Sequence, residues 1–549
     1  MKKSIKTYLK TAAKDYSSRS VNPPVVRAST ILFKTMQELR KFQKDVISKK
    51  TPEVEHWDYG RSGTQTTLQL QKMLRGLEEA YQVFLTPTGF AAVALSIMSI
   101  CRPGDEILIS DAVYRPTQKL TDDLLKEFKV KAVWYNPNSF EDFKNKITRK
   151  TKLIYVENPG SNTFEMNDLG KIVSLAKSKN ILTAIDNTWA TAYFFKPLKL
   201  GFDIAITSAT KYYSGHSDVM AGTVAVNKKA YEKVWWYNHL SGYRLSSDDA
   251  YLIIRGLRTL DVRLEKHQES TKKIINFLKT QRKINKILYP YKPSSREFKL
   301  FKKYYSGASG LLSLIIKSKS KSSVYKFVNS LELFGIGYSW GGFESLAVYT
   351  DPIELGTRRY FKLEKNEHLV RLHIGLEEPK DLQLELGAAL ALDYLTYDLD
   401  TANDKISSSY NLIGFELHGV LLPSRYRITI SSFSGDGEFT NQTTPFYIVV
   451  QSELFPIEKT SASILRVLVT PEWQPGWIYS IGYERSTLSY SGGSGTLNSK
   501  RNSLCIEGGY ESSEFFDFMI DKDLFQETKL RYSTATGLGF NVSLGGIFF

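Results

Sequence analysis

The sequence predicts an α/β fold with a mostly parallel sheet, flanking helices, a smaller α/β domain and a β-rich extension. Short apolar runs, such as residues 105–110, 152–156 and 204–206, alternate with helical patterns through residue 230. Such runs are typical of strands buried on both faces. Several of them end in polar or glycine-containing turns, and ligands gather at the carboxyl ends of parallel strands. The pattern therefore predicts both the sheet and the edge where a site lies.

The length of the chain, its apolar runs and its cysteine count indicate the broad class of the protein. A chain of 549 residues is too long for one core, so two or more domains are expected. No uninterrupted apolar run reaches the roughly 18 residues of a membrane-spanning helix. The basic start lacks the apolar segment of a secretory signal. Two cysteines, Cys101 and Cys505, give no disulfide framework and favour a reducing compartment, so we expect a cytoplasmic protein.

The net charge of +16 is unevenly distributed along the chain. After residue 396 there are 11 Lys and Arg against 17 Asp and Glu, so the basic excess lies in residues 1–396. A basic half could indicate nucleic-acid binding. The lysines are scattered, however, and no recognition motif accompanies them. We interpret them as a solvated surface and expect neither a nucleic-acid partner nor a metal site.

The first 58 residues begin with a polar, helix-like stretch and a proline-containing loop, which is typical of an extended arm. Residues 64–80 have leucines near helical spacing and predict a helix. Between the two lie Tyr59 and Arg61. An arginine can hold a phosphate bidentately, and a tyrosine adds a phenolic donor. The alternative is a loop arginine that pairs with a carboxylate.

Residues 84–95 predict a strand, a turn at Gly89 and an apolar helix. The unpaired N–H groups and the dipole at a helix start attract phosphate, so the backbones of Gly89 and Phe90 are candidate donors. A simple strand–helix turn without a ligand is the alternative.

Two further strand ends carry candidate residues. Tyr114 follows the run at 105–110, where an aromatic ring could stack on a planar cofactor; the alternative is a core tyrosine. Glu157 and Asn158 follow the run at 152–156 and are expected to line the floor of the site.

The most informative residues are Asp186 and Lys211. Asp186 ends the apolar run at 181–185, and Lys211 follows the run at 204–206 behind the hydroxyls of Ser208 and Thr210. A lysine at a buried strand end can form a Schiff base with a carbonyl cofactor, and burial lowers its pKa. A buried carboxylate needs a partner, and the protonated ring nitrogen of pyridoxal phosphate supplies one. The alternative is a surface lysine in a polar loop.

Taken in order over about residues 15–395, these motifs resemble the Cys/Met-metabolism family of pyridoxal-phosphate enzymes. The resemblance implies the fold type I transferase-like fold and pyridoxal 5'-phosphate as cofactor. It implies that Lys211, Tyr114 and Tyr59 are catalytic. It also implies that Tyr59 and Arg61 reach the neighbouring subunit, so the active unit is a homodimer or homotetramer with shared sites. The implied cofactor-binding residues are Lys211, Asp186, Ser208, Thr210, Gly89, Phe90, Tyr114, Tyr59 and Arg61.

The resemblance also divides the chain. It implies an arm at 1–58, a cofactor domain at 59–255 and a small domain at 256–396. Residues 246–268 are expected to form one long helix into the small domain. His373 is expected to be packed rather than catalytic. The expected substrate-binding residues are Arg371, which clamps the α-carboxylate, with Ser339, Trp340, Tyr338 and Asn158.

Within the family, the pair Ser339 and Trp340 resembles the β-lyases rather than the γ-lyases. The expected function is therefore a carbon–sulfur β-lyase that cleaves the small amino-acid substrate cystathionine into homocysteine, pyruvate and ammonia. Lys211 would act first as base and then as acid. The alternatives within the family are cystathionine γ-lyase, methionine γ-lyase and cysteine desulfhydrase.

Residues 397–549 differ in character, with more Ser, Thr, Gly and aromatic residues. Residues 425–430 and 540–544 alternate polar and apolar side chains, which predicts strands. They weakly resemble the last strands of outer-membrane β-barrels, and a soluble β-sandwich fits nearly as well. An alternative for the whole chain is therefore a membrane or surface β-protein that carries an enzyme-like half. A membrane partner is expected for the extension only, if at all; a reading-frame fusion would also explain it.

Overall fold

The computed structural model describes residues 4–13, 19–49, 58–351, 355 and 357–390, together with strands β13 to β21 between residues 415 and 546. The chain divides into two compact units, Met1–Gln383 and Leu384–Phe549. The boundary expected after residue 396 falls outside the described residues.

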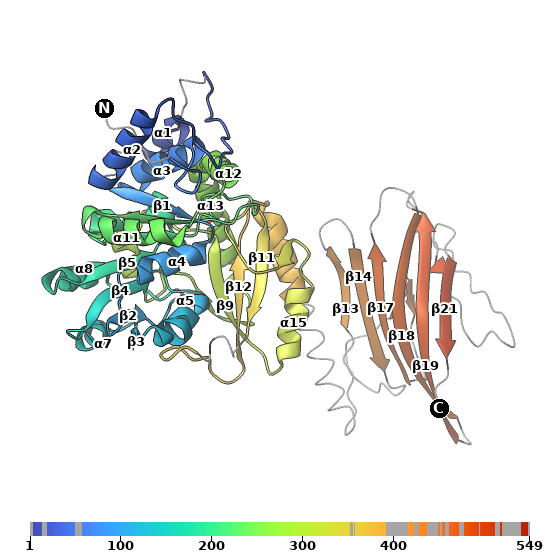
Figure 1. Ribbon diagram of the computed structural model, residues 1–549. Helices are drawn as coiled ribbons and strands as arrows, with labels where there is room; N and C mark the ends of the chain where they lie inside the picture. The colour runs from blue at the N-terminus through green and yellow to red at the C-terminus, as the bar shows by residue number, and fades with distance from the viewer. Residues whose placement is uncertain are drawn as a thin grey trace. The chain divides into compact units, whose positions relative to one another are not determined.

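The first unit contains a seven-stranded sheet in the order β1-β7-β6-β5-β4-β2-β3 (Figure 1). The strands from β6 to β3 are parallel, and β7 alone runs against its two neighbours. The predicted mostly parallel sheet is therefore confirmed. Its strands are β1 (Gln82–Thr86), β2 (Glu106–Ser110), β3 (Lys131–Tyr135), β4 (Thr151–Glu157), β5 (Leu182–Asp186), β6 (Ile204–Thr207) and β7 (Gly222–Val226).

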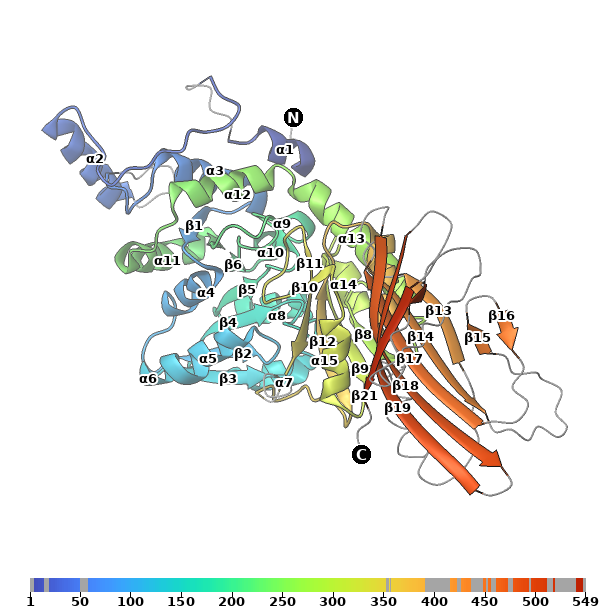
Figure 2. The same cartoon turned by 90° about the vertical axis from the view of Figure 1, so that its right-hand side faces the viewer.

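Helices cover both faces of this sheet, which explains its continuous apolar strands. Figures 1 and 2 show α4 (Gly89–Met98) and α8 (Leu169–Ser178) on opposite sides of β4 and β5. Every residue of β6 is buried. The other helices before residue 245 are α1 (Ile5–Thr11), α2 (Met36–Lys49), α3 (Gln65–Glu78), α5 (Arg115–Lys119), the π-helix η1 (Leu120–Leu124), α6 (Leu125–Glu127), α7 (Phe140–Asn145), α9 (Thr191–Phe194), α10 (Pro197–Leu200) and α11 (Lys228–Ser241).

Helix α3 confirms the helix predicted over residues 64–80. Thr64 caps its start, because the Thr64 hydroxyl accepts from the Thr67 N–H and the Thr67 hydroxyl accepts from the Thr64 N–H. The helix ends at Glu79, whose left-handed backbone has φ 53°. The buried face includes Leu70, Leu74 and Leu77, at the spacing of the predicted apolar stripe.

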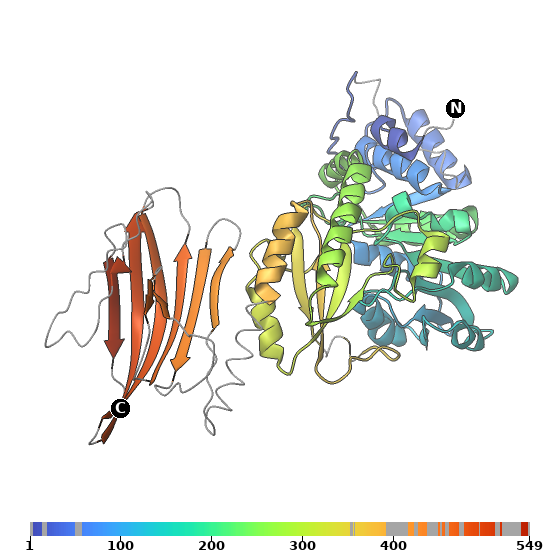
Figure 3. The same ribbon diagram turned by 180° about the vertical axis from the view of Figure 1, so that it is seen from behind.

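A second sheet follows, in the order β10-β11-β12-β9-β8. Figure 3 shows the long helix α13, in yellow-green, beside the strands of this sheet. The sheet belongs to the expected smaller α/β domain. Its elements are α12 (Ser247–Leu257), α13 (Leu260–Leu278), β8 (Ile284–Leu288), α14 (Phe298–Tyr304), β9 (Leu311–Lys317), α15 (Lys321–Asn329), β10 (Phe334–Ile336), β11 (Ser345–Thr350) and β12 (Glu367–His373).

The single long helix expected over residues 246–268 is wrong, since α12 and α13 are separate helices. Thr259 leaves the helical region with φ −112° and ψ 9°. Just before the break, Gly256 lies against the backbone carbonyl oxygens of Tyr213 and Ser214, where a Cβ would overlap both. The last turn of α12 therefore packs directly on the segment that follows Lys211. A helical periodicity of apolar residues does not reveal such a backbone contact.

The second unit contains a seven-stranded sheet in the order β13-β14-β17-β18-β19-β21-β20, antiparallel except for β20 and β21. The strands predicted at 425–430 and 540–544 fall in β14 and β21, which confirms both. No helix in the described part of the chain combines the length and the apolar character that a membrane crossing needs. The strands of the seven-stranded sheet are β13 (Phe415–Leu421), β14 (Tyr426–Gly435), β17 (Ser461–Pro471), β18 (Trp477–Gly492), β19 (Gly495–Tyr510), β20 (Asp517–Phe518) and β21 (Phe540–Gly546). Strands β15 (Ile448–Val450) and β16 (Glu453–Phe455) pair in a separate two-stranded sheet.

Candidate active site

The predicted motifs converge on one edge of the first sheet. Glu157 and Asp186 end the neighbouring parallel strands β4 and β5 and face each other in register. Asp186 also pairs with Ile206 of β6, so the turn after β6 opens beside it. Because β1 runs parallel to β6, the start of α4 lies at the same edge. The expectation that ligand groups gather at the carboxyl ends of the strands agrees with this topology.

Lys211 lies in the turn after β6 and contacts the loop between β10 and β11. Its Nζ donates to the Ser339 hydroxyl at 2.6 Å and lies 5.4 Å from the centre of the Trp340 ring. Gly341 makes the approach possible, because a Cβ there would lie 3.0 Å from the Cβ of Lys211 and φ is +86°. Ser339 itself has φ 101°, a backbone conformation that side chains disfavour and that is often found at functional sites.

Burial, and after it the positive charge of Arg371, lower the pKa of Lys211 to about 8. The ring of Trp340 would favour the charged amine, but such contacts are weak compared with the cost of desolvating a cation. The surroundings therefore raise the fraction of the neutral, nucleophilic amine near neutral pH. This is the chemistry that the sequence assigned to Lys211.

Arg371 lies in the middle of β12, between Val348 of β11 and Ser313 of β9. Its Nη2 donates to the carbonyl oxygen of Ser339 at 3.1 Å. Arg371 and Lys211 thus meet at the same serine, one at its backbone and one at its hydroxyl. The arrangement places one guanidinium beside the lysine, and a guanidinium can hold an amino-acid carboxylate through paired N–H groups.

The imidazole of His373, two residues after Arg371, is packed as expected. It is buried, and its Nε2 accepts from the Gly341 N–H at 3.1 Å. Burial holds the pKa of His373 well below its usual range, so the ring is neutral. It supports the glycine turn beside Lys211.

The carboxylate of Asp186 is held by a residue that the sequence reasoning missed. Its Oδ1 accepts from the Thr188 N–H at 2.9 Å and from the Thr188 hydroxyl at 2.6 Å. The Ser208 N–H in turn donates to the Thr188 hydroxyl at 2.9 Å. Both bonds fall on Oδ1, which leaves Oδ2 for a donor from a ligand. A threonine two residues after an aspartate is a common turn pattern, so this signal was present in the sequence.

Burial raises the pKa of Asp186, and the two bonds from Thr188 oppose that rise. A buried carboxylate of this kind gains most from a cationic partner. A protonated ring nitrogen is such a partner.

The start of α4 forms a cradle with Ser208. The Thr88 hydroxyl accepts from the Ala91 N–H at 2.9 Å, and the first N–H groups, at Gly89 and Phe90, have no partner within the helix. A Cβ at Gly89 would overlap the Ser208 hydroxyl, so only glycine leaves this space open. A helix start beside a serine hydroxyl is suited to a phosphate.

The Thr210 hydroxyl bonds to the backbone of Ala221. Its Oγ1 accepts from the Ala221 N–H at 2.9 Å and donates to the Ala221 carbonyl at 3.1 Å. The hydroxyl thus closes the turn that carries Lys211, and its phosphate role stays a prediction.

The site as a whole fits pyridoxal phosphate. It offers a cradle that a Cβ at Gly89 would fill, a half-buried carboxylate with one oxygen to spare, and a lysine whose pKa is low. These groups suit, in turn, the phosphate, the protonated ring nitrogen and the aldehyde of the cofactor.

The residues after β2 and β4 are brought to the same edge. The Tyr114 N–H donates to the Glu157 carboxylate at 2.6 Å, and the Tyr114 side chain is 49 % exposed. Asn158 is buried: its amide donates to the Tyr305 hydroxyl at 2.8 Å, and its Oδ1 accepts from the Asn167 N–H at 2.7 Å. Its side chain therefore holds the turn together, and its contact with substrate stays a prediction.

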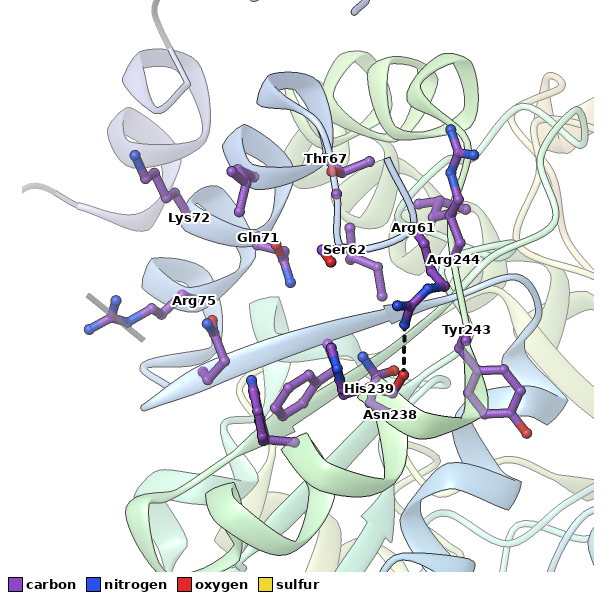
Figure 4. A pocket seen from close by; sticks show the side chains of 18 of the residues that line it. Arg61, Ser62, Thr67, Gln71, Lys72, Arg75, Asn238, His239, Tyr243 and Arg244 are labelled. Atoms are coloured by element: carbon purple, nitrogen blue, oxygen red, sulfur yellow. Dashed lines mark hydrogen bonds between the residues drawn. The ribbon is translucent and has the colours of Figure 1, made fainter. Parts of the chain in front are cut away.

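Tyr59 and Arg61 lie in the segment before helix α3. Arg61 lines a pocket of about 250 Å³, where it donates to the carbonyl of His239 at 3.1 Å (Figure 4). Figure 4 shows Lys72, Arg75 and Arg244 around the same pocket. Within the described residues, no hydrogen bond or ion pair joins Tyr59 or Arg61 to Lys211. Tyr338 is 76 % exposed, beside the Ser339 that binds Lys211.

The low pKa of Lys211 gives a first prediction. Only the neutral amine can attack the cofactor aldehyde, so the rate at which apoenzyme takes up pyridoxal phosphate should rise with pH and level off above about pH 8. Stopped-flow absorbance across pH measures this rate.

The control is Arg371→Met, which removes a positive neighbour. In this variant the midpoint of the pH dependence of the uptake rate should move to higher pH, because Arg371 lowers the pKa of Lys211. A midpoint near the ordinary lysine pKa of 10.5 in the unmodified protein would contradict the prediction.

Comparison with known proteins agrees with this geometry. The model of the Cys/Met metabolism PLP-dependent enzyme family matches residues 6–391. A cystathionine beta-lyase of Haemophilus influenzae is 37 % identical over 379 residues, which cover 68 % of this chain and 94 % of that protein. An L-alanine/L-glutamate racemase of Wolbachia pipientis is 34 % identical, covering 69 % of this chain and 94 % of that protein.

Solved structures resemble the same part of the chain. A cystathionine gamma synthase of Xanthomonas oryzae, in complex with aminoacrylate and cysteine, superposes with a TM-score of 0.66 at 26 % identity. The match covers 72 % of this chain and the whole of that one.

Proposed function

Because the chain belongs to the Cys/Met metabolism PLP-dependent enzyme family, we propose that it is a carbon–sulfur β-lyase that cleaves cystathionine. The observation that carries the proposal is the bond from the Lys211 amine to the Ser339 hydroxyl, next to the Trp340 ring. These are the two residues whose type resembles the β-lyases. The cystathionine beta-lyase of Haemophilus influenzae supports the same assignment.

Pyridoxal phosphate, when bound, supplies an electron sink for the electrons that the Cα–H bond releases. The chain supplies the proton transfers. Lys211 Nζ takes the proton from Cα and gives a proton to sulfur as the Cβ–S bond breaks, so sulfur leaves as the thiol of homocysteine. Water then releases the remaining three-carbon part as pyruvate and ammonia. The pKa of about 8 suits a group that must both accept and donate.

Three neighbours orient these transfers. Arg371 would hold the substrate carboxylate, as expected from its place in β12. Ser339, bonded through its hydroxyl to Lys211 and through its carbonyl to Arg371, would keep the amine and the guanidinium in register. Asp186, held by Thr188, would keep the ring nitrogen protonated.

A product assay on the purified, cofactor-loaded protein tests the proposal. Cleavage at Cβ of cystathionine gives homocysteine and pyruvate, whereas cleavage at Cγ gives cysteine and 2-oxobutyrate. Chromatography of the thiols together with the 2-oxo acids separates the two reactions. Homocysteine and pyruvate in equal amounts are expected; cysteine and 2-oxobutyrate would assign the chain to the γ-lyases instead.

A second candidate is amino-acid racemisation, which the Wolbachia pipientis relative favours. Racemisation also begins with removal of the Cα proton, so it would use Lys211 at the same site. Incubation with L-alanine and with L-glutamate, followed by chiral chromatography, reports it. D-alanine or D-glutamate formation faster than cystathionine cleavage would make racemisation the main reaction.

We also propose that two copies of the chain share their sites. Arg61 and Tyr59 have no link to Lys211 among the described residues, and Arg61 lies in a basic pocket with Lys72 and Arg75. The shared-site arrangement would bring Arg61 to the cofactor phosphate of the partner.

Mixing two inactive variants tests this arrangement. Arg61→Ala and Lys211→Ala, exchanged as subunits, should regain about a quarter of the unmodified activity, since half of randomly formed dimers are hybrids with one intact site. Activity of the mixture is measured after denaturation and joint refolding. If hybrids form, as native mass spectrometry shows, and activity stays absent, each site belongs to one chain.

A further inference from the structure

A buried cluster of charges lies outside the groups that the proposed reaction uses. Arg358 donates through Nε to Asp111 at 2.9 Å, through Nη2 to Glu165 at 2.7 Å and through Nη1 to the Thr163 hydroxyl at 2.8 Å. The side chains of Arg358, Asp111 and Glu165 are 4 %, 0 % and 7 % exposed. Each of the three guanidinium nitrogens thus donates to a partner, and two of these partners are carboxylates.

The cluster joins segments that are far apart in the sequence. Arg358 lies between β11 and β12 of the small domain, Asp111 directly follows β2, and Glu165 follows the turn after β4. The N–H groups of Arg359 and Tyr360 also donate to Asp111, at 2.9 and 3.1 Å. One aspartate is therefore held by three consecutive residues of the small domain.

Asp111 begins the segment that carries Tyr114, and this segment is braced on several sides. The Gln118 amide donates to the carbonyls of Asp111 and Val113, and the Thr357 hydroxyl donates to Gln118 at 2.8 Å. The Ser161 N–H donates to the Ala112 carbonyl at 2.7 Å. Residues 111–113 are thus braced from the small domain, from α5 and from the turn after β4, in addition to the bond from the Asp111 N–H to the Tyr135 carbonyl of β3 at 3.1 Å.

The physics of buried charge explains why an arginine stands here. A buried ion pair adds little net stability, because desolvation offsets the attraction. Removing the cation, however, leaves Asp111 and Glu165 as two buried carboxylates that repel each other. The planar guanidinium is the side chain that can satisfy both at once and set their separation. The Arg358 guanidinium therefore determines how the segment after β2, which carries Asp111, lies relative to the segment after β4, which carries Glu165.

We propose that Arg358 is a positioning residue that acts through Asp111 to hold residues 111–118, and with them Tyr114, at the cofactor edge of the sheet. The small domain thereby controls the geometry of a group on the cofactor domain. The role of Tyr114 in this inference rests on the proposed function. The first test of the inference does not depend on that function.

Hydrogen exchange of the apoenzyme is that first test. Arg358→Met keeps an unbranched side chain and removes the charge; exchange of the amides at 111–118 should quicken by roughly tenfold or more, because the segment loses its anchor. Lys321→Met is the matched control, because it removes a half-exposed cation of the small domain that pairs with Asp351 at 2.8 Å. Equal exchange in the two variants would overturn the inference without touching the proposed function.

The second test uses the loaded enzyme. Arg358→Met should change the visible circular dichroism of the bound cofactor and lower kcat/KM for cystathionine by roughly 100-fold, the size expected for a small misplacement. Arg358→Lys keeps the charge without the fork and should recover part of both. If Arg358 acts through Tyr114, its loss should cost little more in a Tyr114→Ala background. If the losses of kcat/KM caused by the Arg358 and Tyr114 substitutions multiply in the double variant, the inference is overturned.

A milder variant covers the case in which Arg358→Met does not fold. Thr357→Val removes only the bond to Gln118 and leaves the buried charges paired. It should quicken exchange at 111–118 and leave thermal unfolding nearly unchanged. Unchanged exchange in this variant would count against control of the segment by the small domain. An unmodified protein that takes up no cofactor would overturn the proposed function alone.

Discussion

Lys211→Ala should lower cystathionine cleavage by roughly 10⁴-fold, the upper end of what one acid–base group contributes. Lys211 would bind the cofactor covalently, remove the Cα proton and protonate sulfur, so one substitution removes three functions. The amine that performs them is held by the Ser339 hydroxyl and has its pKa lowered to about 8. Steady-state kinetics and the absorption band of the bound cofactor measure the loss together.

Two control variants sharpen this test. Lys211→Arg keeps the positive charge but cannot lose its proton, so it should be as inactive as the alanine variant. Lys196→Ala removes a lysine that forms an ion pair with Glu79 at 2.7 Å, away from the site, and should leave turnover within about twofold. Turnover by Lys211→Ala at an unmodified rate would exclude Lys211 as the catalytic base.

Asp186→Asn should lower kcat by roughly 100-fold, since a hydrogen bond to a charged group contributes about 1.5–3 kcal/mol and each 1.36 kcal/mol is tenfold in rate. The asparagine keeps the shape of the side chain and can still accept from Thr188. It cannot stabilise a protonated ring nitrogen. Single-turnover kinetics with saturating cystathionine isolate the chemical step from binding.

Asp203→Asn is the matched control. Asp203 is also buried and also accepts from the N–H and hydroxyl of a threonine, Thr183, at 2.9 and 3.0 Å. It lies just before β6, at the opposite end of the strand from the site. The Asp203→Asn variant should retain kcat, and its only expected loss is in stability. Similar losses of kcat in the two variants would mean that Asp186 acts through the fold rather than on the ring nitrogen.

The local parts of the fold could be predicted because each depends on a few neighbouring residues. Buried parallel strands require continuous apolar runs, so the sequence at 204–206 predicted β6 and the turn with Lys211. A strand, a glycine and an apolar run in succession predicted β1, the turn at Gly89 and α4. These features follow from backbone sterics and side-chain burial within one segment.

The tertiary structure alone decided which of these segments meet. Ser339 reaches Lys211 from 128 positions away, and Arg358 reaches Asp111 from 247 positions away. The close packing of Gly256 on the carbonyl oxygens of Tyr213 and Ser214 is another such contact. A single sequence encodes such contacts only through the packing of whole domains, because the pairing energy appears once both surfaces have been brought together. The types and local placement of the site residues were therefore determined by the sequence, whereas their partners, their pKa values and the link from the small domain came from the packing.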